Sequence, residues 1–165
     1  MQIIGYITVF NVAVAQILLT LVLTMINISD FIRVPIATII IIGSIFAYGN
    51  YRCQHPEFKD PLEKPLFHHL PWLDGWALTH FLTFFWTGFV LKNPIVLKIS
   101  LFVGLMWEVF EHVVGKRRPG WMGGYGGCNL ATDKKDDGNW WYGKWTDIVM
   151  NTTGLILGFL LQKLI

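Results

Sequence analysis

Apolar residues occupy long, nearly uninterrupted runs of this chain, and the runs predict membrane-spanning helices. About 20 consecutive apolar residues are enough to cross the hydrocarbon core of a bilayer. Five runs approach or exceed this length, and polar segments separate them. We therefore predict an all-α integral membrane bundle that forms one transmembrane domain over residues 1–165. The predicted spans are about 3–28, 34–51, 75–91, 94–114 and 146–165.

Two polar segments, residues 50–74 and 115–145, join the second span to the third and the fourth span to the fifth. The first contains four prolines between residues 56 and 71, so it cannot be a continuous helix, and its many apolar side chains suit the membrane surface. The second is rich in glycine but lacks the Gly-Lys-Ser/Thr sequence of a phosphate-binding loop. Because the second and fourth spans both end there, the two loops lie on the same side as the amino terminus.

Positive charge is divided unevenly between the two sides of the predicted bundle. Lys and Arg are more frequent in cytoplasmic loops, so the richer side is predicted to be cytosolic. That side holds the amino terminus, both long loops and nine basic residues: Arg52, Lys59, Lys64, Lys116, Arg117, Arg118, Lys134, Lys135 and Lys144. The other side holds four: Arg33, Lys92, Lys98 and Lys163. A disulfide between Cys53 and Cys128 would require an oxidising compartment and therefore the opposite orientation.

The composition agrees with a membrane protein. Of the 165 residues, 53% are hydrophobic and 15% are charged, and the mean hydropathy is +0.48. A soluble domain carries about 25% charged residues. The net charge of +2 comes without a basic tract or an RNA-binding signature, so nucleic acid is excluded as a partner. The two cysteines form no CxxC pair and do not indicate a zinc site.

Polar side chains interrupt the third, fourth and fifth predicted spans at one depth. Glu108 and Glu111 share a face of the fourth span, and Asp147 and Asn151 share a face of the fifth. His80 lies four residues inside the third span, roughly 6 Å along a helix. Ionisable groups in spanning helices are costly and usually mark function. A purely structural role, with local partners for each group, would scatter them in depth.

These side chains predict a site of hard oxygen donors for a divalent cation, with Ca²⁺ first and Mn²⁺ or Mg²⁺ as alternatives. The predicted ligands are Glu108, Glu111, Asp147 and Asn151. Glu111 and its neighbour His112 point about 100° apart on a helix, and we expect Glu111 to face the site. An imidazole exchanges protons near neutral pH, so His80 is the candidate general base. If the site exists, the carboxylates of Glu108 and Asp147 lie within roughly 5 Å of each other, and a cavity opens sideways toward lipid.

The same residues resemble the base-exchange phosphatidylserine synthases, over about half of the chain. That family carries a histidine in one span, Trp-Glu-x-x-Glu in the next, and then a Trp-Trp pair followed by Asp, Asn and Gly. The matching residues are His80, Trp107-Glu108-Val109-Phe110-Glu111, Trp140-Trp141, Asp147, Asn151 and Gly154. The chain departs from the family in having Asp137 one position further from the Trp pair and Tyr142 in place of an aspartate after it.

This resemblance implies a divalent-metal-dependent enzyme that exchanges the headgroup of a phospholipid for a small hydroxyl acceptor such as serine. Glu108, Glu111 and Asp147 would hold the cation on the lipid phosphate, and His80 would deprotonate the acceptor. The remaining candidates would bind substrate, namely Trp140, Trp141, Asp137 and His112.

A second resemblance is to the VanZ-like membrane proteins, which are small and have about five spans. It rests on Asp74-x₅-His80-Phe81 and on Asp147-x₃-Asn151-x₂-Gly154-x₃-Gly158. It implies a non-enzymatic protein that binds an envelope or lipid component. The chain length and the Asp-to-Asn spacing favour this family, whereas the paired glutamates favour the synthases. Gly154 and Gly158 permit close packing of helices, either within the chain or between copies of it, so a homo-oligomer is one possible assembly.

Overall fold

The structure, a computed structural model, describes residues 22, 28–54, 60–117 and 143–165. The chain divides into two compact units, one of residues 1–59 with 118–140 and one of residues 60–117 with 141–165. Each unit is described by itself. The predicted first span lies almost entirely outside the described residues.

Helix α2 (Asp30–Gln54) is the long described helix of the first unit. It begins four residues before the predicted second span, because Ser29 caps it: the Phe31 N–H donates to Ser29 Oγ at 3.3 Å. Its stretch Asp30–Gly49 is long and apolar enough to cross a membrane. No other helix within the described ranges meets that criterion of length and composition.

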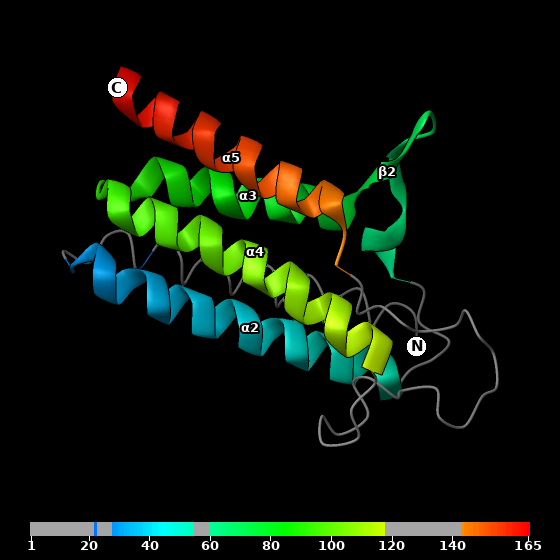
Figure 1. The fold of residues 1–165 in the computed structure, drawn as a ribbon. Helices are drawn as coiled ribbons and strands as arrows, with labels where there is room; N and C mark the ends of the chain where they lie inside the picture. Colours follow the sequence, from blue (N-terminus) through cyan, green and yellow to red (C-terminus); the bar gives the residue numbers. More distant parts are fainter. Residues whose placement is uncertain (1–21, 23–27, 55–59, 118–142) are drawn as a thin grey trace. The chain divides into compact units, whose positions relative to one another are not determined.

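The second unit contains three long helices and a β-hairpin (Figure 1). Its elements are η1 (Pro61–Glu63), β1 (Pro65–Phe67), β2 (Leu70–Asp74), α3 (Gly75–Val90), α4 (Pro94–Arg117) and α5 (Trp145–Leu164). The predicted helical class is confirmed, since α2 to α5 cover the second to fifth predicted spans. That α3, α4 and α5 cross a membrane stays a prediction. α3 has 16 residues, about 24 Å of helix, and polar side chains interrupt α4 and α5.

The β-hairpin lies in the segment that we predicted to be a loop. β1 and β2 pair antiparallel, with Phe67 opposite Leu70. Pro65 and Pro71 are tolerated because both strands of a two-stranded sheet are edge strands. Buried Asp60 joins the start of this segment to α3, since its carboxylate accepts the indole N–H of Trp76 at 2.9 Å.

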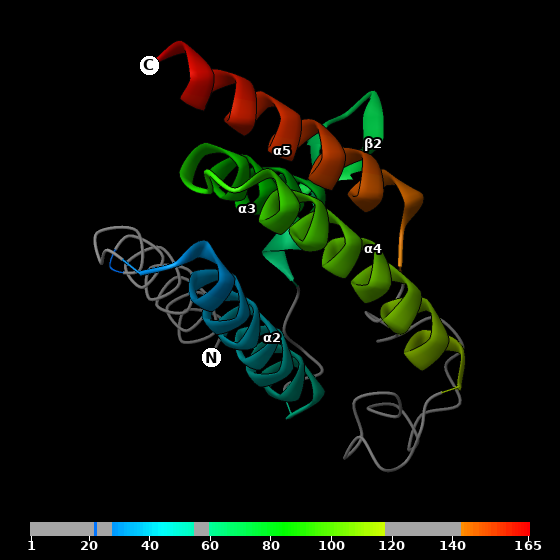
Figure 2. The same cartoon turned by 60° about the vertical axis from the view of Figure 1, so that its left-hand side comes forward.

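Helices α3 and α5 lie side by side in both views of the unit (Figures 1 and 2). Glycines make this contact close. Gly154 and Gly158 of α5 rest on the carbonyls of Phe81 and Phe85 in α3, and a Cβ at either glycine would overlap that backbone. The small-xxx-small pair therefore packs within the chain, and it fixes the height of α5 against α3.

We expect Gly154→Val to destabilise the second unit by about 1–3 kcal/mol, because overpacking forces the α3 and α5 backbones apart. Gly43 is the matched control, since a Cβ at this position of α2 meets nothing within 4 Å. Gly43→Ala should leave stability unchanged or slightly raised. Thermal and denaturant unfolding of the purified protein measure both variants. Equal stability of Gly154→Val and the parent protein would contradict this packing.

Candidate metal centre

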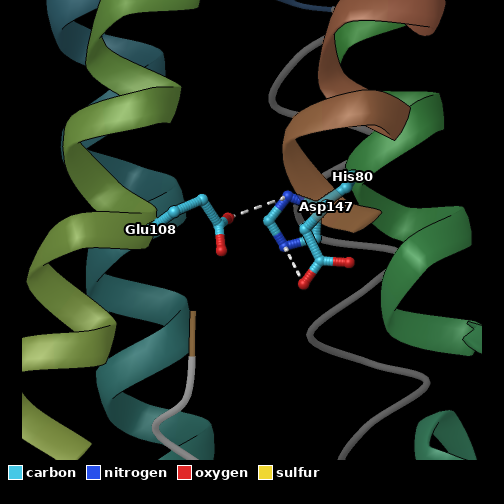
Figure 3. Close-up of side chains that lie close together, drawn as sticks. All are labelled: His80, Glu108 and Asp147. Atoms are coloured by element: carbon cyan, nitrogen blue, oxygen red, sulfur yellow. Dashed lines mark ion pairs between the residues drawn. The ribbon is translucent and has the colours of Figure 1, made fainter. Parts of the chain in front are cut away.

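Three helices of the second unit each place one ionisable side chain at the same point. His80 projects from α3, Glu108 from α4 and Asp147 from α5, and they face one another (Figure 3). Each offers one donor atom, and these atoms all lie within 4.8 Å of one another. Two oxygens bound to one Ca²⁺ lie within roughly 5 Å of each other. The approach of Glu108 to Asp147 that the sequence predicts is therefore present, and the group could hold a metal ion.

The two carboxylate oxygens of Glu108, which is only 3% exposed, have different surroundings. Oε2 accepts the backbone N–H of Lys144 at 3.1 Å. Oε1 lies 3.6 Å from His80 Nδ1 and has no hydrogen-bond partner among the described residues. A buried charged oxygen without a donor is costly. Oε1 is therefore the atom of this group that most requires a cation or a proton.

Asn151, on α5, orients the imidazole of His80. Its side chain is fully buried, and its Oδ1 lies 3.0 Å from His80 Nδ1. Because an amide oxygen only accepts, Nδ1 is the donor in this hydrogen bond. In the neutral imidazole the lone pair then belongs to Nε2, which lies 3.9 Å from Asp147 Oδ2. Nε2 is thus the nitrogen that can accept a proton or bind a cation.

The two residues before α5 connect all three helices at the level of the site. Gly143 packs against Glu108 so closely that a Cβ would overlap the Glu108 carbonyl oxygen. Lys144 donates from Nζ to Asp74 Oδ2 at 2.8 Å. Asp74 caps α3 at the same time, since its Oδ1 accepts the Ala77 N–H at 2.8 Å. The start of α5 is thereby held to α4 and to the first turn of α3.

Negative charge exceeds positive charge at this end of the unit. Asp74, Glu108 and Asp147 are all buried, and among the described residues Lys144 is the lysine that pairs with them. With the imidazole neutral and all three carboxylates ionised, three negative charges and one ammonium leave two negative charges. Buried charges are normally paired or coordinate metals. A divalent cation would balance this excess and give Oε1 of Glu108 a partner, and carboxylate donors suit Ca²⁺, Mn²⁺ or Mg²⁺.

The other predicted site residues have different positions and contacts. Glu111 is outside the group: its Oε1 accepts the indole N–H of Trp107 at 2.8 Å, so the tryptophan one turn earlier holds it. His112 is exposed. Asn151, predicted as a metal ligand, lies beside the group and contacts His80, and its role as a ligand stays a prediction. The predicted substrate-binding residues Trp140, Trp141 and Asp137 lie outside the described residues.

The sequence interpretation missed the contributions of Gly143, Lys144 and Asp74. Asp74 had a readable signal, since an aspartate directly before an apolar run is a typical helix N-cap. Lys144 donates its backbone N–H to Glu108. Nearly every residue type has this N–H, so the sequence could not indicate the contact. Gly143 is one of many glycines in and around a long loop, and its spacing does not single it out.

We expect Glu108→Gln and Asp147→Asn each to weaken Mn²⁺ binding at least about tenfold, because even outer partners of metal ligands contribute 10–100-fold. Glu111→Gln is the matched control. It makes the same chemical change one turn away on α4, and its amide oxygen can still accept the Trp107 N–H. Titration of the purified protein with Mn²⁺, followed by the electron paramagnetic resonance signal of the free ion, measures all three. Equal losses in the three variants would contradict the assignment.

Comparisons of the chain with protein-family models, with curated proteins and with solved structures find no match. The resemblances to phosphatidylserine synthases and to VanZ-like proteins therefore stay predictions. The geometry of His80, Glu108 and Asp147 carries the argument for function.

Proposed function

We propose that this chain is a membrane-embedded, divalent-metal-dependent transferase that exchanges the headgroup of a phospholipid for a small hydroxyl compound such as serine. One observation carries the proposal. Two buried carboxylates, Glu108 and Asp147, and the half-buried imidazole of His80 come together from three helices, and with both carboxylates ionised they hold more negative charge than the described residues neutralise. A site that needs a cation and has a base beside it is suited to chemistry on a phosphate ester.

The surfaces of α3, α4 and α5 support a membrane location. Large apolar side chains are exposed along α4 and α5, and Leu82 is exposed on α3, which is typical of surfaces covered by lipid or by a partner. They include Leu82, Ile95, Phe102, Val109, Val149, Ile156 and Leu160. A five-span arrangement would bury these faces in hydrocarbon and leave the metal centre near the ends of the helices, at headgroup depth.

When bound, the cation supplies charge stabilisation for the phosphate oxygens. The residues of the chain handle the proton. His80 Nε2 takes the proton from the hydroxyl group of the attacking compound, and the oxygen of that hydroxyl bonds to the phosphorus of the lipid. The bond from phosphorus to the old headgroup oxygen breaks, and the departing oxygen takes the proton back from the imidazolium. Asn151 keeps the Nδ1–H in place throughout, which leaves Nε2 as the exchanging atom.

The assignment predicts a specific pattern of activity. The purified protein with Ca²⁺ or Mn²⁺ should incorporate labelled serine into phospholipid vesicles, and a chelator should abolish this. His80→Ala should lower turnover about 10²–10⁴-fold, the range for a general base, while Mn²⁺ binding is largely kept. Asp147→Asn should lose both turnover and Mn²⁺ binding, and Glu111→Gln should keep both turnover and Mn²⁺ binding. Cation binding without exchange of any headgroup would refute the transferase and leave the metal centre intact.

The second candidate is a non-enzymatic membrane protein in which the polar group holds the helices together. Direct contacts favour it, since His80–Asn151 and Lys144–Asp74 join the helices and the hairpin without an ion. In that case Glu108→Gln should change the unfolding temperature and have no activity to remove. In a transferase the same variant keeps its fold and loses turnover.

We further propose that the amino terminus and both long loops face the cytosol. Nine of the thirteen Lys and Arg residues lie on that side of a five-span topology. Cys53 and Cys128 lie on the same side, so a membrane-impermeant maleimide should label neither in sealed cells and both in opened membranes. Labelling in sealed cells, or only after reduction, would reverse the orientation.

A further inference from the structure

A groove of about 390 Å³ opens between α4 and α5 next to the metal centre. Its α4 wall is one stripe at helical spacing, and its α5 wall is one turn of helix. The main lining residues are Lys98, Leu101, Phe102 and Leu105 from α4 and Ile148 and Asn151 from α5. Apart from Asn151, Thr152 and the end at Lys98, this lining is apolar.

The packing of the unit explains why the groove exists. α5 presents Gly154 and Gly158 to α3, so these two helices touch along their backbones. Ile148 and Thr152 of α5 line the groove opposite residues of α4, where the two helices are not in such close backbone contact. The Thr152 hydroxyl donates to the Ile148 carbonyl at 2.8 Å, so its hydrogen is used within the helix. The groove thus offers apolar surface to an occupant.

The groove lies next to the metal centre. Asn151 lines it and also contacts His80, with 3.0 Å between Asn151 Oδ1 and His80 Nδ1. On α4, Leu101, Leu105 and Glu108 lie at i, i+4 and i+7, so the metal-binding carboxylate continues the stripe that lines the groove. Leu105 and Lys98 are separated by about 10 Å of helix. The groove therefore ends at Asn151, beside the acidic residues of the metal centre, and most of its lining is apolar.

We propose that this groove holds an acyl chain of the phospholipid whose headgroup occupies the metal centre. The inference rests on the proposed function and adds where the lipid lies. A ligand with its phosphate at Glu108 and Asp147 has its chains directed along the helices, and the groove is the apolar path that starts at this point. Lys98 lies at the far end of the groove, and an acyl chain does not favour contact with its charge. The residues that contact the chain are then Leu101, Leu105 and Ile148.

A photoactivatable phosphatidylcholine with a diazirine near the middle of one acyl chain tests this in vesicles. Mass spectrometry should place cross-links on residues 98–105 and 148–152. Leu82, which is 52% exposed on α3, reports on general lipid contact. Cross-links spread equally over Leu82 and the groove would overturn the proposal. Their absence from the groove would mean that another part of the chain fills it, and would also overturn it.

Leu101→Trp fills the groove and Leu82→Trp is the matched control. Leu101→Trp should lower cross-linking to the groove about tenfold, because the acyl chain would lose the burial of roughly two methylene groups. Leu82→Trp should not lower it. Asp147→Asn separates this inference from the proposed function, because it removes the metal site and leaves the groove unchanged. Groove cross-linking that persists in Asp147→Asn without any headgroup exchange in the parent protein would keep the lipid site and refute the transferase. Unchanged groove cross-linking in Leu101→Trp would contradict the lipid site itself.

Discussion

The uncompensated charge of Glu108 and Asp147 is the constraint on which the second unit depends. Both carboxylates are buried between helices, and Oε1 of Glu108 has no hydrogen-bond donor in the described part of the chain. Charged groups that are removed from water require a partner. Lys144 gives Glu108 one backbone N–H and gives its ammonium to Asp74. The remaining negative charge determines which ligands this end of the unit can accept.

Helix packing and the site are parts of one arrangement. The glycine contacts between α3 and α5 set the relative height of the two helices, and this height places Asn151 and Asp147 beside His80. Gly143 then brings the start of α5 onto the backbone of α4 at Glu108. Because these contacts are backbone to backbone, the donor atoms are held by the least adaptable parts of the fold. Such rigidity would suit the proposed exchange of lipid at this site.

Much of this arrangement could be predicted from the sequence. The apolar runs predicted α2 to α5, and a shared depth of polar residues predicted that His80, Glu108 and Asp147 would meet. Helical spacing predicted that Glu108 and Glu111 would both be ligands. They lie about 60° apart on α4. Glu111 accepts a hydrogen bond from the indole of Trp107, one turn earlier, and only Glu108 joins the group with His80 and Asp147. The hairpin escaped prediction because strands of three and five residues carry little periodicity.

Diffraction from crystals soaked in Mn²⁺, recorded at a wavelength where manganese scatters anomalously, would show whether Glu108 and Asp147 bind one ion. The account predicts one strong anomalous peak between α4 and α5, within about 2.6 Å of a carboxylate oxygen of both Glu108 and Asp147, with the His80 ring beside it. A peak shared by other acidic residues would contradict the account. So would a structure in which Glu108 and Asp147 keep their positions and bind no ion.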